Sequence, residues 1–389
     1  MDAASLLDLR KFLAPETVFG AGASELAGRY AQNLGARKVL LVSDEGVRAQ
    51  SWFAAIADSI DASGLGMELF DQVHANPRDT EVMHGAEVYR ATGCDGIVAV
   101  GGGSPMDCAK GIGIVCTNDR HVLEFEGVDN VENPGPPLIC VPTTAGSSAD
   151  VSQFAIINDT TRKVKIAIVS KAMVPDVALI DPMLTLTMPP ELTANTGVDA
   201  LTHAIEAYVS NAHGPTTDLF AIEAARRVAV NLPRVMADPA DKEARAGMML
   251  GSMYAGLAFS NAILGAVHAM AHSLGGLMDL PHGQCNAMLL DHVIAYNFDA
   301  APERYADIAV ALGAPLRPDA DNATRREAVL GAVRALKRAV GVTKGLASLG
   351  VRPEDLDGLT EFALHDPCMV TNPKPSTAEE LRAVFHNAL

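Results

Sequence analysis

The chain has 389 residues, 49% of them hydrophobic, and a formal net charge of −17 from 30 basic and 47 acidic residues. This length suits two domains with large buried cores. The negative charge argues against nucleic acid or an anionic membrane surface as a partner. The N-terminus has early acids and no long apolar core, so we expect no secretory signal and a cytoplasmic location.

The six cysteines are scattered and form no C-x-x-C pair, which argues against a zinc knuckle or a redox pair. Between Arg245 and Asp279 no residue carries a fixed charge. A membrane span needs about 20 apolar residues, but this stretch contains Asn261, histidines and serines, and no basic cluster flanks it. Two buried helices of a soluble core are therefore the better interpretation.

In the first part of the chain, short apolar runs alternate with helical patterns. The runs that predict strands are 16–22, 38–44, 66–70, 96–104 and 138–144. Such alternation predicts a parallel, doubly wound sheet, with 16–22 as an edge element. After Asp181 the sequence changes to a proline-marked connection followed by long helical patterns. We predict an α/β domain over 1–187 and an all-helical domain over 188–389.

Glycines directly follow the strand expected to end at residue 100. Gly101, Gly102 and Gly103 would let backbone N–H groups approach a phosphate, and the following helix start adds partial positive charge. Ser104 suits the N-cap of that helix and Pro105 its first position. Because the full G-x-G-x-x-G pattern is absent, a plain tight turn is the alternative to a phosphate loop.

Asp44 ends the strand predicted over 38–44. An acid at this place can accept hydrogen bonds from the ribose diol of an adenosine and repels a 2′-phosphate. This interpretation favours NAD over NADP. The alternative is an ordinary surface acid at a strand end.

Four histidines and a carboxylate form the pattern most indicative of chemistry. Asp199 and His203 are four residues apart in a helical pattern, so they share one face, and His268 and His272 repeat this spacing. His282 follows a proline, where a turn could bring it back over a helix end. Three imidazoles and one carboxylate would suit a divalent ion. Hydrogen-bonded core histidines are the alternative, and the residues alone do not choose between His268 and His272.

The order D-x-x-x-H, H-x-x-x-H and P-H-G resembles the iron-containing (group III) alcohol dehydrogenase family, which has a dehydroquinate-synthase-like architecture. The resemblance implies that four side chains hold the metal: Asp199, His203, His268 and His282. It implies iron(II), with zinc as the alternative, and leaves His272 unligated near the substrate. His272 is then the candidate proton relay, since histidine titrates near neutral pH; a structural role behind the ligands is its alternative.

The segment GGGSPMDCAK also resembles a family motif, G-G-G-S-x-x-D-x-A-K, which binds the pyrophosphate of the dinucleotide. It implies contacts to NAD from five residues: Gly101, Gly102, Gly103, Ser104 and Asp107.

The segment 142–154 resembles the part of the family that wraps the cofactor, which implies contacts from Thr143 and Thr144. Ser148 and Asp150 depart from the glycine and glutamate that are usual there. Lys165 matches a lysine that reaches a cofactor ribose, with Lys163 as a rival.

The resemblance also places Gln153, Phe154, Phe259 and Cys368 in the substrate pocket and Asn76 in a turn beside the nicotinamide; the alternative for each aromatic is a core position. None of them is basic, so we expect a small or medium primary alcohol and its aldehyde as substrates. The chain would then be an NAD-linked, metal-dependent alcohol dehydrogenase, with the strand near the N-terminus at a homodimer interface. Two alternatives are a non-redox NAD and zinc enzyme of the dehydroquinate-synthase-like group and a catalytically silent NAD and metal sensor. The first would need basic side chains to grip phosphate, and 251–282 offers none.

Overall fold

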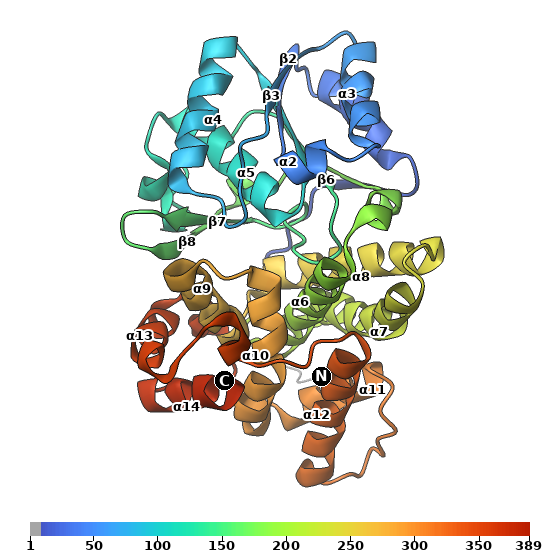
Figure 1. Cartoon of the computed structure of the whole chain (residues 1–389), viewed down its shortest axis with the longest axis vertical. Helices are drawn as coiled ribbons and strands as arrows, with labels where there is room; N and C mark the ends of the chain where they lie inside the picture. Colours follow the sequence, from blue (N-terminus) through green and yellow to red (C-terminus); the bar gives the residue numbers. More distant parts are fainter. Residues whose placement is uncertain (1–8) are drawn as a thin grey trace. The chain divides into compact units, whose positions relative to one another are not determined.

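The computed structural model describes residues 9–389, which divide into two compact units (Figure 1). One unit comprises Leu13–Met188, and the other comprises Pro189–Leu389 together with residues 9–12. We refer to them as the α/β unit and the helical unit. The assignment of nucleotide binding to 1–187 and of metal binding to 188–389 stays a prediction.

The α/β unit is built on a six-stranded sheet in which every neighbouring pair is parallel, in the order β1-β9-β6-β4-β2-β3. Its strands are β1 (Glu16–Phe19), β2 (Lys38–Val42), β3 (Gly66–Phe70), β4 (Gly96–Gly101), β6 (Leu138–Pro142) and β9 (Val177–Ile180). The central strands β4 and β6 are buried along their whole length, because helices cover both faces of such a sheet. The predicted parallel, doubly wound sheet is confirmed.

Alternate residues of the central strands face two separate cores. Leu40 and Ile97 pack on one side with residues of α4 and α5, whereas Val39 and Val98 pack on the other with residues of α1 and α3. This alternation follows from the two-residue period of a strand. The helices of this unit are α1 (Ala27–Asn33), α2 (Glu45–Arg48), α3 (Phe53–Ala62), α4 (Asp79–Thr92) and α5 (Gly103–Asn118).

A second, three-stranded sheet follows the order β5-β8-β7. It consists of β5 (Gly127–Val128), β7 (Phe154–Asp159) and β8 (Val164–Val169), and β7 and β8 form an antiparallel hairpin. This sheet and β9 are additional to the strands expected from the sequence. The hairpin follows the loop after β6, which contains the predicted cofactor contacts Thr143 and Thr144.

The helical unit contains no β-strand between Pro189 and Leu389, as predicted. Its α-helices are α6 (Pro190–Val209), α7 (Pro215–Ala237), α8 (Lys242–Ala262), α9 (Ala266–Met278), α10 (His282–Asn297), α11 (Pro302–Ala311), α12 (Asn322–Ala339), α13 (Leu356–His365) and α14 (Ala378–Ala388), joined by loops and short 3₁₀ helices. Across residues 9–389 no single helix is long and apolar enough to cross a membrane; α8 and α9 would suffice only as a pair bent by 97°.

Candidate metal centre and cofactor loop

Helix α6 presents three functional side chains along one face. Asp199, His203 and Glu206 follow one another at spacings of four and three residues, which places them on consecutive turns of the same side. All three are nearly inaccessible to solvent, with exposed fractions of 2%, 3% and 5%. Buried ionisable groups need partners, and these three find them on α9 and α10.

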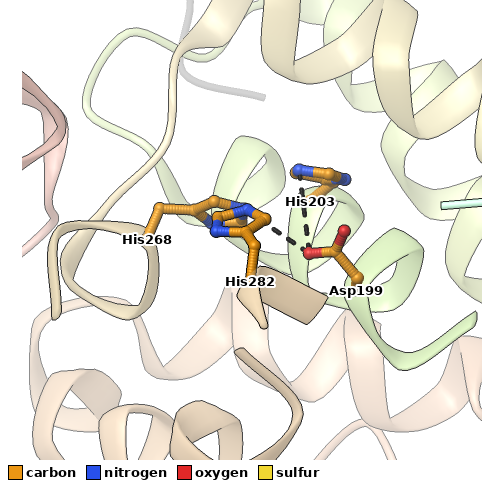
Figure 2. A group of neighbouring side chains, drawn as sticks. All are labelled: Asp199, His203, His268 and His282. Atoms are coloured by element: carbon orange, nitrogen blue, oxygen red, sulfur yellow. Dashed lines mark ion pairs between the residues drawn. The ribbon is translucent and has the colours of Figure 1, made fainter. Parts of the chain in front are cut away.

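The four side chains predicted to hold the metal converge at one point (Figure 2). One potential ligand atom from each of Asp199, His203, His268 and His282 lies within 4.8 Å of all the others. His268 Nε2 is 3.7 Å from Asp199 Oδ1, and the His203 ring stacks on the His268 ring at a centroid distance of 4.6 Å. Helix α6 supplies two of these groups, and α9 and α10 supply one each.

His282 is brought in by the first residues of α10 rather than by a turn that folds back. The helix begins at His282, with Pro281 as its N-cap. Gly283 permits the close approach of α10 to α6, because a Cβ at this position would lie 3.3 Å from the carbonyl oxygen of Asn195 and 3.6 Å from Asp199 Cβ.

The geometry separates the two histidines of the H-x-x-x-H pattern. His268 belongs to the four-residue cluster, whereas His272 groups with Asp366 and Cys368. Nδ1 of His272 lies 2.7 Å from Asp366 Oδ2, and the other oxygen of Asp366 accepts a hydrogen bond from the backbone N–H of Cys368 at 2.8 Å. The ring of His272 stacks on that of His282 at a centroid distance of 5.4 Å, so it lies beside the cluster.

The electrostatics favour uncharged imidazole in the cluster. Burial lowers the pKa of His268 well below its ordinary value, and the neighbouring His203 adds to this effect. A neutral imidazole keeps the lone pair that a metal ion requires. Burial disfavours the Asp366 carboxylate, but His272 and two hydrogen bonds involving Cys368 outweigh this effect and lower the pKa of Asp366.

The environment of Asn286 on α10 tests whether a cation fits the cluster. Its Nδ2 is within hydrogen-bonding distance of three potential ligand atoms: Asp199 Oδ1 at 2.7 Å, His268 Nε2 at 3.0 Å and His282 Nε2 at 3.1 Å. An amide nitrogen has two hydrogens and cannot donate to three acceptors at once. Three acceptor atoms aimed at one buried point are therefore better satisfied by a divalent ion, and one carboxylate with three imidazoles suits iron(II) or zinc.

The glycine loop starts α5 two residues earlier than expected. Gly102 is the N-cap and α5 begins at Gly103, so the expectation that Ser104 is the N-cap is wrong. The reason is that the chain turns directly after β4 and the helix begins without any capping side chain. The free backbone N–H groups of this helix start are a suitable site for phosphate.

The absence of side chains on the glycines leaves room against the loop 143–147. A Cβ at Gly102 would lie 3.3 Å from Thr144 Cγ2, and a Cβ at Gly103 would lie 3.0 Å from Ser147 Cβ. The backbone N–H of Thr143 donates to the carbonyl oxygen of Gly101 at 2.9 Å. The predicted contacts Thr143 and Thr144 thus lie directly beside the glycine turn.

Asp107 and Lys110 of α5 hold the start of the β7–β8 hairpin. Asp107 Oδ2 accepts a hydrogen bond from the backbone N–H of Ile156 at 3.1 Å. The buried ammonium group of Lys110 donates to the carbonyl oxygens of Ser152 at 2.9 Å and of Phe154 at 2.7 Å. These bonds fix the segment that carries Gln153 and Phe154, which are both buried.

Asn76 and Lys165, predicted for different parts of the site, lie together. Lys165 Nζ donates to Asn76 Oδ1 at 2.7 Å. Asn76 has a φ of +56°, a left-handed conformation that asparagine tolerates better than most residues. The rival Lys163 lies outside β8, in the hairpin turn, with a φ of +56°.

Asp44 caps the short helix α2, and its carboxylate accepts a hydrogen bond from the backbone N–H of Val47 at 2.8 Å. Burial raises the pKa of Asp44.

Ser148 adopts a φ of +52°, which gives a physical reason why glycine is usual at this position. Asp150 is buried, and this burial raises the pKa of its carboxyl to about 6.

The remaining predicted pocket residues lie in the helical unit. The ring of Phe259 stacks on that of His203 at a centroid distance of 4.4 Å, so this phenylalanine lies directly against a candidate ligand. Cys368 is 5% exposed, and burial raises its pKa well above the ordinary value. Its thiol is therefore uncharged and hydrogen-bonded to Asp366.

Three residues of the centre were missed at the level of sequence: Glu206, Asn286 and Asp366. The first two had a signal, since Glu206 continues the face of Asp199 and His203, and Asn286 lies four residues after His282 on α10. Asp366 had none, because it meets His272 across 94 residues of sequence.

Comparison with known proteins agrees with this geometry. Residues 14–182 match the family model described as iron-containing alcohol dehydrogenase, and residues 193–389 match its C-terminal part. The 1,3-propanediol dehydrogenase of Klebsiella pneumoniae is 42% identical, over 95% of this chain and 96% of that protein. The NAD-dependent methanol dehydrogenase of Bacillus methanolicus is 37% identical, over 97% and 99%.

A crystal structure of a 1,3-propanediol oxidoreductase superimposes with a TM-score of 0.95 at 41% identity, covering 98% of this chain and all of that one. Two family models together match most of the chain, and the relatives match it over nearly their whole length. The chain belongs to the iron-containing alcohol dehydrogenase family.

Proposed function

We propose that this protein is a metal-dependent, NAD-linked alcohol dehydrogenase that interconverts a small primary alcohol and its aldehyde. The observation that carries the proposal is the convergence of Asp199, His203, His268 and His282 on one buried point. An ion held by these residues would stabilise negative charge on the substrate oxygen as a Lewis acid, and NAD would be the hydride acceptor. The alcohol thus loses a hydride to the nicotinamide and a proton to the protein.

His272 is the residue that we propose for the proton. Asp366 accepts a hydrogen bond from its Nδ1–H, which leaves Nε2 as the basic atom. Its ring lies against that of His282, so a substrate oxygen near the ion would be within reach of this base. Phe259 and Cys368 would supply apolar surface to the carbon chain of the substrate.

In the α/β unit, the glycine turn and the loop 143–147 would bind the pyrophosphate, with Gly101, Gly102, Gly103, Ser104, Thr143 and Thr144 in contact with it. Asp107 would act by holding β7 in place, and Lys165 would reach a ribose while its bond to Asn76 orients it. Asp44 would accept the hydroxyl groups of the adenosine ribose, so we propose a preference for NAD over NADP.

The substrate is proposed from two observations. None of the four predicted pocket residues is basic, nor is Asn76, which disfavours anionic substrates, and the relatives bear the names of propanediol and methanol dehydrogenases. We therefore propose short alcohols, including diols. We also propose a homodimer that uses the edge strand β1, and a cytoplasmic location.

The test is a panel of alcohols and aldehydes assayed in both directions with NAD and NADP, using protein loaded anaerobically with iron(II) or with zinc. We expect NADH formation from short primary alcohols and at least about tenfold lower efficiency with NADP, equivalent to roughly 1.4 kcal/mol. The Asp199→Ala variant is the control and should be inactive with both metals. Tight NAD binding without turnover of any alcohol would instead support a silent sensor, and elimination of phosphate from a sugar-derived acid would support the non-redox alternative.

A further inference from the structure

Both histidines of α9 are bonded to acids that come from different parts of the chain. Nδ1 of His268 lies 2.6 Å from Oε2 of Glu206 on α6, and Nδ1 of His272 lies 2.7 Å from Oδ2 of Asp366 in the loop after α13. The two pairs have the same chemistry, but only His268 belongs to the candidate ligand cluster. They therefore allow a direct comparison of what a carboxylate does behind each ring.

Glu206 determines which nitrogen of His268 faces the cluster. Its Oε1 accepts the backbone N–H of Val267 at 2.7 Å while its Oε2 lies against His268 Nδ1. Glu206 therefore occupies the Nδ1 side of the ring, and Nε2 is the ring nitrogen left to face the cluster. This Nε2 lies 3.7 Å from Asp199 Oδ1.

The same carboxylate anchors the start of the helix that carries the imidazole. A Cβ on Gly265 would lie 3.1 Å from Glu206 Oε1 and 2.9 Å from Asn372 Oδ1, so the backbone here fits closely against both side chains. Asn372 accepts the N–H of Ala266 at 3.1 Å but makes no contact of this kind with His268. Glu206 therefore both contacts the ring of His268 and anchors the start of α9, whereas Asn372 only anchors the start of α9.

We propose that Glu206 is a positioning residue for the metal: it fixes the orientation of His268, with Nδ1 toward Glu206 and Nε2 toward the cluster. Asp366 orients His272 in the same way but contributes nothing to holding the ion. This inference rests on the proposed function, because it concerns the same centre. It differs from the ligand assignment in that Glu206 does not touch the ion. Carboxylates in this position strengthen imidazole as a ligand, and their loss weakens metal binding about 10- to 100-fold.

The experiment compares Glu206→Gln, Asp366→Asn and Asn372→Ala in the full chain. Metal-free protein is titrated with cobalt(II) or zinc against a competing chelator, without alcohol or NAD, and the cobalt(II) absorption spectrum is recorded. We expect Glu206→Gln to bind about 10- to 100-fold more weakly with a shifted cobalt spectrum. Asp366→Asn should keep the affinity and the spectrum of the unsubstituted protein and should lose turnover instead.

The Asn372→Ala variant separates positioning from simple support of the helix start. If Glu206 only stabilises α9, Glu206→Gln and Asn372→Ala should lose the same amount of metal affinity and leave the cobalt spectrum unchanged. This result would overturn the proposal. Unaltered affinity in Glu206→Gln would overturn it as well. Should Glu206→Gln fail to fold by circular dichroism, Glu206→Asp replaces it; a folded aspartate variant with full affinity again contradicts the proposal. Because metal binding is measured without turnover, inactivity toward alcohols would count against the proposed function alone.

Discussion

The candidate metal centre and the predicted cofactor loop are built by opposite means. The centre in the helical unit is made of side chains from three helices, and His268 is held by Glu206 of α6. The loop in the α/β unit is made of backbone, and it depends on side chains that are missing at Gly102 and Gly103. The candidate metal centre should therefore lose its ion when a functional group is removed. The cofactor loop should lose affinity for NADH when atoms are added.

Removal of a ligand should have the largest effect. We expect Asp199→Ala and His268→Ala to be purified without metal and to lose turnover by at least about a thousandfold, or roughly 4 kcal/mol of transition-state stabilisation. Elemental analysis and steady-state kinetics measure this. The matched control is His272→Ala, one turn away, which should keep its metal and lose turnover only. A metal-free His272→Ala together with a metal-loaded His268→Ala would reverse the ligand assignment.

Metal removal should lower the stability of the protein by a smaller, calculable amount. A ligand present at a hundredfold excess over its dissociation constant stabilises the folded state by about 2.7 kcal/mol. We expect the melting temperature to fall when a chelator strips the ion and to recover when zinc or iron(II) is returned. The Asp199→Ala variant should not respond to either treatment. A response in this variant equal to that of the unsubstituted protein would place the stabilising site elsewhere.

Addition of atoms to the glycine turn should weaken NADH binding and leave the metal in place. We expect Gly102→Val to raise the dissociation constant of NADH about tenfold, or roughly 1.4 kcal/mol, because its side chain would crowd Thr144. Fluorescence titration of NADH measures this. A control at a helical glycine is Gly331→Ala, whose Cβ would meet no atom within 4 Å; NADH binding should not change there. Normal NADH affinity in Gly102→Val would remove the turn from the cofactor site.

Loss of the contact between Lys165 and Asn76 should have the smallest effect. Since the bond joins two side chains at 2.7 Å, Lys165→Met should raise the KM for NAD several-fold, in line with roughly 1 kcal/mol for a hydrogen bond. A double-mutant cycle with Asn76→Ala should show coupling of about 0.5–1.5 kcal/mol. Additive effects of the two substitutions would mean that they act on NAD separately.

Periodicity was informative wherever neighbours in sequence are neighbours in space. The two faces of β2 and β4, the helical character of the chain after Pro189, and the pairing of Asp199 with His203 all follow from spacings of two or four residues. The start of α5 was predicted two residues too late, because the helix begins directly after β4 without a capping side chain and does not use Ser104 as its cap. The hairpin β7–β8 was not predicted, because the hydrogen bonds that fix it come from Asp107 and Lys110, more than 40 residues earlier in the chain.

The sequence by itself determined which residue types could bind an ion and along which helix face they lie. It left His268 and His272 equivalent, since both repeat the same spacing on one helix. The family resemblance pointed to His268, and the tertiary structure gives the physical basis, because Glu206, Asp366 and His282 arrive at the two rings from distant parts of the chain. The physical reason is that metal binding requires several lone pairs to meet at one point, and this convergence is a property of packed helices rather than of any single one.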